Sequence, residues 1–291
     1  MTQRKIYALG FFDGVHLGHQ ALLTRCCRLA AAEKACPAAI TFDRHPRALF
    51  APCPPLLQTA ADRQTLLTQY GMETVRVLPV TAETMGRDWQ EFLEMLLQDG
   101  AVGFVCGYDF RFGHKGVGDA EKLEAFCAQR GLPCIIVPEQ QLEGIRISST
   151  HIRRLIEEGH MIEAARFLGQ RHRLTGVVVP GRQVGRTIGV PTANILFPEG
   201  VVIPRLGVYA CVATVDGRTY RAVTNVGSRP TVGGHQTRAE SWLLGFAGDL
   251  YGKTLTLEFG EFLRPEQKFD SLEALKAQIQ RDAEQTRALQ R

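Results

Sequence analysis

The sequence predicts an α/β domain with a parallel sheet over residues 1–169, followed by an antiparallel β-barrel with a terminal helix over residues 170–291. Two observations predict this division. In the first part, apolar runs of strand length alternate with segments of helical periodicity, which is typical of βα units around a parallel sheet. In the second part, short apolar runs follow one another without helices between them, which is typical of an antiparallel barrel or sandwich. A length of 291 residues also favours two domains, at roughly 150 residues each.

In the first part the expected elements alternate along the chain. Strands are expected at about 6–9, 38–42, 74–80, 102–106 and 134–137, and helices at about 18–34, 61–70, 85–98, 120–130, 149–158 and 161–168. In the helix expected at 85–98, the apolar residues Trp89, Phe92, Leu93 and Leu96 fall on one face. Parallel sheets bind ligands beyond the carboxyl ends of their strands, so we expect the chemistry in the segments that follow the strands.

The second part predicts strands separated by turn signals. They are expected at about 174–179, 207–215, 219–225, 239–246 and 254–262. Asp216-Gly217 is a hairpin signal between two of them. The segment 271–288 predicts a helix that Ser271 can cap, with Leu272, Leu275 and Ile279 on one face.

Composition and charge limit the class of protein. A hydrophobic content of 45% and a charged content of 22% are typical of a soluble globular protein, and a net charge of +4 is small for a nucleic-acid binder. No apolar run approaches the ~18 residues of a membrane span, and Asp13 interrupts the first apolar stretch too early for a signal peptide. Eight cysteines without a C-x-x-C pair indicate buried thiols in a reducing compartment. We therefore expect a cytoplasmic protein, a monomer or weak homo-oligomer, with no nucleic-acid or membrane partner.

The first candidate site is the segment from Gly10 to His19, which reads GFFDGVHLGH and follows the first expected strand. Backbone N–H groups at the start of the next helix suit an anion, above all a phosphate. His16 and His19 can lie on one side of the first helical turn, and Gly18 lets a ligand approach the backbone. Two alternatives stay open: a metal site, although no third ligand of the usual spacing follows nearby, and a glycine turn with solvated histidines.

Further distinctive segments follow the later strands of the first part. They read TFDRHP at 41–46, GYDFRFG at 107–113 and RISSTHIR at 146–153. Arg146 and the hydroxyl groups of Ser149 and Thr150 can hold phosphates around a helix start. As alternatives, a serine of this segment only caps the helix, and the segment from Asp109 to Phe112 is an ordinary aromatic turn.

A loop rich in glycine and arginine opens the second part. Residues 181–194 read GRQVGRTIGVPTAN, without the pattern of a Walker A loop. The backbone of such a loop can wrap a polyphosphate, while Thr192 and Asn194 place side-chain oxygens on a magnesium ion. The alternative is a long polar hairpin loop.

Together, the segments of the first part resemble the N-terminal module of the bacterial bifunctional riboflavin kinase/FAD synthetase family, a Rossmann-like module of the H-x-G-H nucleotidyltransferase superfamily. The resemblance implies that ATP adenylylates FMN to give FAD and pyrophosphate, with Mg²⁺ bridging the phosphates. It implies catalytic roles for His16 and His19. It further implies ATP contacts from Gly10, Phe11, Phe12, Asp13, Gly18, Arg146, Ser149 and Thr150, and flavin contacts from Asp109, Phe110, Arg111 and Phe112.

The second part resembles the riboflavin kinase module of the same family. The matching segments are the loop at 181–194, NVGSRPT at 225–231, GDLYG at 248–252 and RPEQKF at 264–269. The resemblance implies transfer of the γ-phosphate of ATP to the 5′-hydroxyl of riboflavin to give FMN, with Glu240 as the base. It further implies ATP contacts from Gly181, Gly185, Arg186 and Gly189, flavin contacts from Asn225, Arg229 and Arg264, and a Mg²⁺ ion on Thr192 and Asn194.

The chain departs from the family pattern at four positions. Phe11 stands where the family often has Asn, Arg44 where Pro is common, His151 where Arg is common, and Trp242 where His or a similar residue is frequent. None of these changes removes a charged residue assigned to catalysis, so we expect altered affinity or packing. The alternatives are a relative with one decayed site and a flavin-responsive regulatory protein. Both motif sets look intact, which disfavours the first, and retention of Glu240 and both histidines disfavours the second.

Overall fold

The computed structural model describes residues 3–181, 189–231 and 234–289. Contacts between residues divide the chain into two units, Met1–Ser149 and Thr150–Arg291. Sequence patterns place the boundary at 169/170 instead. The two helices between these points, α6 (Ser149–Glu158) and α7 (Met161–Leu168), pack on the second unit, where the N–H of Arg205 donates to the carbonyl of Ile156 at 3.3 Å. The boundary between the functional domains stays a prediction.

A parallel five-stranded sheet organises the first unit, as the alternation of strands and helices predicts. Its strands lie in the order β3 (Thr74–Leu78), β2 (Cys36–Phe42), β1 (Lys5–Leu9), β4 (Ala101–Gly107) and β7 (Cys134–Val137). All four pairings are parallel. The order reverses between β1 and β4, and ligands of such sheets bind beyond the strand ends at this reversal. The segments after β1 and β4 are therefore well placed for a site.

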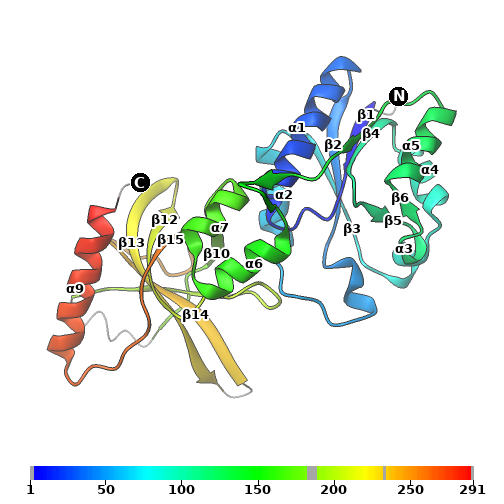
Figure 1. Cartoon of the computed structure of the whole chain (residues 1–291). Coiled ribbons are helices and arrows are strands. Elements are labelled where there is room, and N and C mark those ends of the chain that lie inside the picture. The colour runs from blue at the N-terminus through cyan, green and yellow to red at the C-terminus, as the bar shows by residue number, and fades with distance from the viewer. Residues whose placement is uncertain (1–2, 182–188, 232–233, 290–291) are drawn as a thin grey trace. The chain divides into compact units, whose positions relative to one another are not determined.

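Helices cover both faces of this sheet (Figure 1). Helices α1 (Leu17–Ala32) and α2 (Ala60–Gln69) pack on one face, where they meet Ile6 and Ala8 of β1. Helices α4 (Trp89–Gln98) and α5 (Ala120–Gln129) pack on the other face, where they meet Tyr7 and Leu9. Because neighbouring strand residues point to opposite faces, burial of both faces gives the strand its continuous apolar run.

The helix expected at 85–98 is confirmed from Trp89 to Gln98, but its predicted start at Met85 is wrong. The structure has two helices there, α3 (Ala82–Gly86) and α4, because Asp88 begins a new helix by accepting the N–H of Gln90 at 2.7 Å. Short elements without a readable period were also missed. They are the ribbons β5 (Arg111–Phe112) with β6 (Gly118–Asp119) and β8 (Gln141–Leu142) with β9 (Ile145–Arg146), and the 3₁₀ turns η1 (Asp13–Val15), η2 (Pro46–Leu49) and η3 (His114–Gly116).

The second unit is a nearly closed antiparallel barrel, as expected. Its strands lie in the order β10 (Arg173–Val177), β15 (Thr254–Arg264), β12 (Gly207–Val215), β13 (Arg218–Thr231), β14 (Gly234–Leu243) and β11 (Ala193–Leu196). The N–H of Val179 donates to the carbonyl of Asn194 at 2.9 Å, which brings the two edge strands together. Asp216 and Gly217 both have positive φ and form the predicted hairpin turn.

Strand β11 was not predicted. Sequence patterns place Thr192 and Asn194 together in a loop, whereas Asn194 lies in a strand whose backbone pairs with Glu240. The pattern missed the strand because a run of four residues after Pro-Thr carries too little periodicity.

Helix α9 (Leu272–Ala288) closes part of the outer face of the barrel. Its Ala283 packs with Val208, Val223 and Trp242 of the strands. The hydroxyl of Ser271 accepts the N–H of Ala274 at 3.1 Å, which confirms the predicted cap. Among the described residues, no helix is long and apolar enough to span a membrane. All eight cysteines are free thiols.

Candidate active sites

The segment from Gly10 to His19 forms a rigid turn between β1 and α1. Phe12 has φ 60°, and its ring is fully buried. That ring lies against Gly10, where a Cβ atom would come within 2.9 Å of it. A side chain at position 10 would therefore displace the ring that shapes the turn.

His16 and His19 stack on each other at the start of α1, with ring centroids 3.7 Å apart and planes 13° apart. Nδ1 of His16 accepts the N–H of His19 at 3.3 Å and caps the helix. A neutral His16 ring therefore carries its proton on Nε2. Nδ1 of His19 is buried and has no hydrogen-bond partner among the described residues. The pair thus offers N–H donors beside the helix start.

Both imidazoles are neutral at neutral pH. Burial lowers the pKa of His16 from 6.5 to about 4. Burial also lowers the pKa of His19 well below its usual value, and the neighbouring His16 and Arg63 lower it further. A phosphate at this turn is therefore met by neutral donors and by the helix dipole rather than by imidazolium charge.

A hydrogen bond joins the first segment to the segment at 146–153. The hydroxyl of Ser149 donates to the carbonyl of Asp13 at 3.0 Å. The buried carboxylate of Asp13 accepts the N–H of Leu57 at 2.8 Å, so it holds the loop after β2 in place. Two of the predicted ATP residues are therefore brought together. Thr150 follows Ser149 in α6 and falls in the second unit.

Arg146 lies on the predicted flavin segment. Its Nη2 is 2.7 Å from Oδ2 of Asp109, its Nε is 3.4 Å from Oε2 of Glu139, and its guanidinium carbon is 5.5 Å from the ring centroid of Tyr108. The structure thus brings a predicted ATP residue into contact with a predicted flavin residue.

A cavity of about 550 Å³ opens beside this segment in the first unit. Phe110 and Phe112 stack with centroids 5.3 Å apart, and both line the cavity together with Gly10 and Arg111. Phe12 and Asp13 do not line it. Further lining residues that sequence reasoning missed are Arg47, Phe50, Arg87 and Lys115. Aromatic walls with several cations suit a planar anionic ligand.

Arg63 is a second residue that sequence reasoning missed. Its side chain is fully buried on α2, its Nη2 donates to the carbonyl of Phe42, and its guanidinium carbon lies 4.5 Å from the ring centroid of Phe11. Its Nε and Nη1 have no hydrogen-bond partner in the described part of the chain. Its positive charge is close enough to lower the pKa of His19. Leu66 and Leu67, three and four residues later on α2, mark its helix face as the buried one.

In the second unit, strand register places four of the predicted kinase residues in one row. Asn194 of β11 lies opposite Glu240 of β14, which lies opposite Asn225 of β13. Asn225 lies opposite Val208 of β12, which lies opposite Arg264 of β15. Directly opposed residues share a face of the sheet.

This row lies on the outer face of the barrel. The neighbouring pair Thr224 and Ser241 points the other way and is fully buried, with its hydroxyls 2.9 Å apart. Val208, which belongs to the row, packs against Ala283 of α9. Glu240 therefore lies on the face of the barrel that α9 partly covers.

A cavity of about 650 Å³ includes one end of the row. It is lined by Gly181, Thr192 and Asn194 and by the segment 248–251. Oδ1 of Asn194 is buried and has no hydrogen-bond partner among the described residues, as expected of an oxygen that awaits a cation or a donor. A Cβ on Gly181 would lie 2.5 Å from Nδ2 of Asn194, so a larger residue there would displace the Asn194 amide. These residues fit a Mg²⁺ ion.

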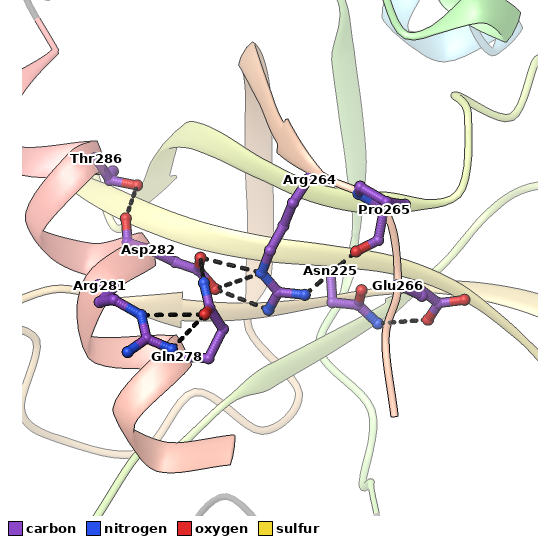
Figure 2. Close-up of polar contacts among 8 residues, drawn as sticks. All are labelled: Asn225, Arg264, Pro265, Glu266, Gln278, Arg281, Asp282 and Thr286. Atoms are coloured by element: carbon purple, nitrogen blue, oxygen red, sulfur yellow. Dashed lines mark hydrogen bonds and ion pairs between the residues drawn. The ribbon is translucent and has the colours of Figure 1, made fainter. Parts of the chain in front are cut away.

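Other predicted residues are placed less fully. Gly185 and Arg186 lie outside the described residues. Gly189 has φ 76° and lies outside the cavity lining, and Arg229 is described only as backbone in β13. Arg264 bonds to Asp282 and Asn225 bonds to Glu266 (Figure 2). Their contacts with flavin stay predictions.

The remaining departures from the family pattern have structural partners. His151 packs edge-on against Phe167 at 4.7 Å between ring centroids. Trp242 packs in the cluster under α9. Arg44 is exposed, with its Nη2 3.5 Å from Oδ2 of Asp43.

The first unit has a turn with N–H donors at the reversal point of a parallel sheet, and the second has a cavity lined by Thr192 and by Asn194, whose amide oxygen has no hydrogen-bond partner among the residues described. These are features expected of an enzyme that handles nucleotide phosphates. Family comparison identifies both parts. The FAD synthetase family matches residues 1–151, and the riboflavin kinase family matches residues 168–290. The chain therefore belongs to the bifunctional riboflavin kinase/FMN adenylyltransferase family, with the FAD synthetase part first and the riboflavin kinase part second.

Named relatives extend over nearly the whole chain. The bifunctional riboflavin kinase/FMN adenylyltransferase of Listeria monocytogenes is 36% identical over 289 residues, which is 98% of this chain and 92% of the relative. The protein of the same name from Pseudomonas fluorescens is 37% identical, with the same coverage. A crystal structure described as a macrolide-efflux protein from Streptococcus pneumoniae has a TM-score of 0.90 at 32% identity, covering 100% of this chain and 96% of that chain.

The buried histidine pair predicts an acid-sensitive first unit. Because the pKa of His16 falls from 6.5 to about 4 on folding, unfolding takes up a proton in this range, and the free energy of unfolding falls as the pH falls from 6.5 towards 4. His16→Asn keeps a capping acceptor and removes this proton. When unfolding in urea is measured at a series of pH values, the free energy of unfolding of His16→Asn should fall less steeply with decreasing pH than that of the parent protein. The difference in slope should be up to about 1.4 kcal/mol per pH unit. The exposed His114→Asn is the control, and an unchanged decline in His16→Asn would contradict the burial argument.

Proposed function

We propose that the two activities of the family are carried by the two sites described above. In the second unit, Glu240 serves as the base while the γ-phosphate of ATP passes to the 5′-hydroxyl of riboflavin, giving FMN. In the first unit, His16 and His19 act while FMN attacks the α-phosphate of a second ATP, giving FAD and pyrophosphate. The observation that carries the kinase assignment is the register row that sets Glu240 between Asn194 and Asn225.

The kinase step needs a proton acceptor beside a hydroxyl. An alcohol is a poor nucleophile at neutral pH, and a positioned carboxylate helps by taking its proton as the bond to phosphorus forms. Glu240 lies between two amide residues on a face that has the nucleotide-sized cavity at one end. ATP in that cavity and riboflavin along the row would bring the γ-phosphate and the hydroxyl together.

Thr192 and Asn194 would hold Mg²⁺ in the kinase cavity. When bound, the ion neutralises charge on the ATP phosphates. The support is the chemistry of the donors: an amide oxygen without a hydrogen-bond partner among the described residues and a hydroxyl residue in the same lining.

The adenylyl transfer needs positioning and charge stabilisation rather than a covalent intermediate. The N–H groups of His16 and His19 and the start of α1 would receive the α-phosphate, and the turn that holds them is fixed by Phe12. The cavity of about 550 Å³ would take the flavin against Phe110 and Phe112, with its cations facing the FMN phosphate. Arg146 would exchange Asp109 for a phosphate oxygen when ATP binds.

We place these reactions in the cytoplasm, in a monomer or weak homo-oligomer that binds riboflavin, FMN, FAD and ATP. The location, the oligomeric state and the independence from nucleic acid stay predictions from the sequence.

Glu240→Gln should lower riboflavin phosphorylation by a factor of about 10²–10⁴, because the amide keeps the shape and cannot take a proton. FMN adenylylation in the same preparation should be unchanged. Chromatographic separation of riboflavin, FMN and FAD with ATP and Mg²⁺ measures both. Glu261→Gln, on an exposed position of β15, is the matched control. Normal FMN formation by Glu240→Gln would remove Glu240 from the role of base.

His16→Ala combined with His19→Ala should stop the reaction at FMN. Removal of two donors to the α-phosphate should lower adenylylation by at least about 10²-fold, since one such donor typically contributes that much. Riboflavin phosphorylation reports that the second unit is intact. The exposed His160→Ala is the control, and FAD formation at the normal rate by the double variant would refute the assignment.

Asn194→Ala should raise the Mg²⁺ concentration needed for half-maximal riboflavin phosphorylation by about tenfold, because one oxygen ligand of the ion is lost. The Mg²⁺ concentration for half-maximal FMN adenylylation should stay the same. Titration of each reaction with Mg²⁺ at saturating ATP tests this. An unchanged midpoint for phosphorylation would mean that Asn194 does not hold the ion.

A further inference from the structure

Polar contacts join α9 to the end of β15, and the chain that follows β15 makes a second contact with Asn225, in the row that holds Glu240 (Figure 2). The contacts of α9 are made by Asp282, whose side chain is only 3% exposed. The carboxylate accepts Nε of Arg264 at 3.1 Å on both oxygens and Nη2 of Arg264 at 2.8 Å on Oδ2. Gln278, one turn earlier on α9, donates Nε2 to Oδ1 at 2.8 Å. A buried carboxylate is therefore paired with a guanidinium in the planar geometry that makes such pairs strong.

The guanidinium group of Arg264 therefore makes its hydrogen bonds within the protein. In addition to Asp282, its Nη1 donates to the carbonyl of Pro265 at 3.2 Å, and its guanidinium carbon lies 5.8 Å from the ring centroid of Phe269. Loss of one partner would leave a largely buried charge unpaired, which is costly. The pair therefore fixes the end of β15 and the chain that follows it.

The next residue along the chain reaches the kinase row. Oε1 of Glu266 accepts Nδ2 of Asn225 at 3.0 Å. A Cβ on Gly227 would lie 2.5 Å from the same oxygen, so the carboxylate lies close against the backbone of this strand position. Proline at 265 restricts the backbone between the buried ion pair and Glu266.

The chemistry of Glu266 decides how Asn225 is turned. An ionised carboxylate only accepts hydrogen bonds, so the NH₂ group of Asn225 must face it and Oδ1 must face away. Asn225 lies directly opposite Glu240. We propose that Glu266, held by the Arg264–Asp282 pair, is a positioning residue of the kinase site that turns the amide of Asn225 so that Oδ1 accepts a hydroxyl of riboflavin. The proposal rests on the kinase role of the row around Glu240.

Glu266→Gln is the sharpest test, because it keeps the shape but can donate as well as accept, and so permits both orientations of the Asn225 amide. We expect the KM for riboflavin to rise by about tenfold, the equivalent of one lost hydrogen bond, with a smaller change in kcat. FMN adenylylation should be unchanged. A purely structural contact would tolerate this isosteric change. A KM within twofold of the parent protein would overturn the proposal.

Asp282→Asn tests the support from α9. The amide offers only one oxygen to Arg264, so Glu266 should be held less firmly. The KM for riboflavin should therefore rise, as expected for Glu266→Gln. Glu284→Gln makes the same chemical change at an exposed position of α9 and should be neutral. When Asp282→Asn and Glu266→Gln are combined, KM should rise by less than the product of the single effects. A full product would mean that the two residues act separately and would overturn the link.

The two hypotheses fail in different ways. If Glu240→Gln abolishes phosphorylation while Glu266→Gln has parental kinetics, the site assignment holds and the positioning role is wrong. If Glu240→Gln and Asn194→Ala both phosphorylate riboflavin with parental kinetics, the site assignment itself is wrong, and the positioning role is wrong with it.

Discussion

The second unit depends on the register between β13 and β14. Ten directly opposed pairs join these strands, from Ala222 with Leu243 to Thr231 with Gly234. A slip of one residue would turn Glu240 into the barrel and bring Ser241 out, because neighbouring strand residues face opposite sides. The hydrogen bond between the buried hydroxyls of Thr224 and Ser241 opposes such a slip, since either group alone would be buried without this partner. A polar contact on the inner face thus helps to hold Glu240 on the outer face.

The first unit also holds its candidate site residues in fixed positions, but it does so with turns rather than with strand register. Its parallel sheet is buried on both faces, so side chains of the strands themselves have no open face to work on. The site is made instead by the turns after the strands, where a left-handed Phe12, a capping His16 and the carboxylate of Asp13 hold backbone and rings in place. Burial also keeps both imidazoles of this turn neutral.

Sequence patterns predict most of the architecture, and particular residues show why. Alternating apolar runs predicted the parallel sheet, and Asp216-Gly217 predicted a hairpin, because these signals are local. The break between α3 and α4 was missed because the apolar period continues across Asp88. Arg63 and the pairing of Arg264 with Asp282 were missed for another reason. Their partners lie in other elements, and the local sequence does not predict which distant residues will be in contact in the fold.

The order of pairing in the barrel also has a consequence for how the chain acquires its fold during synthesis. Every strand of the parallel sheet precedes residue 138, so the first unit can form from a contiguous stretch of emerging chain. Among the described strands, in contrast, β10 pairs with β15 alone and approaches β11 through Val179, so the barrel cannot be completed until residue 264 has been made. Long-range pairings of this kind form late and slowly. A ribosome-bound chain would therefore complete its adenylyltransferase fold first, although that unit carries out the second of the two reactions.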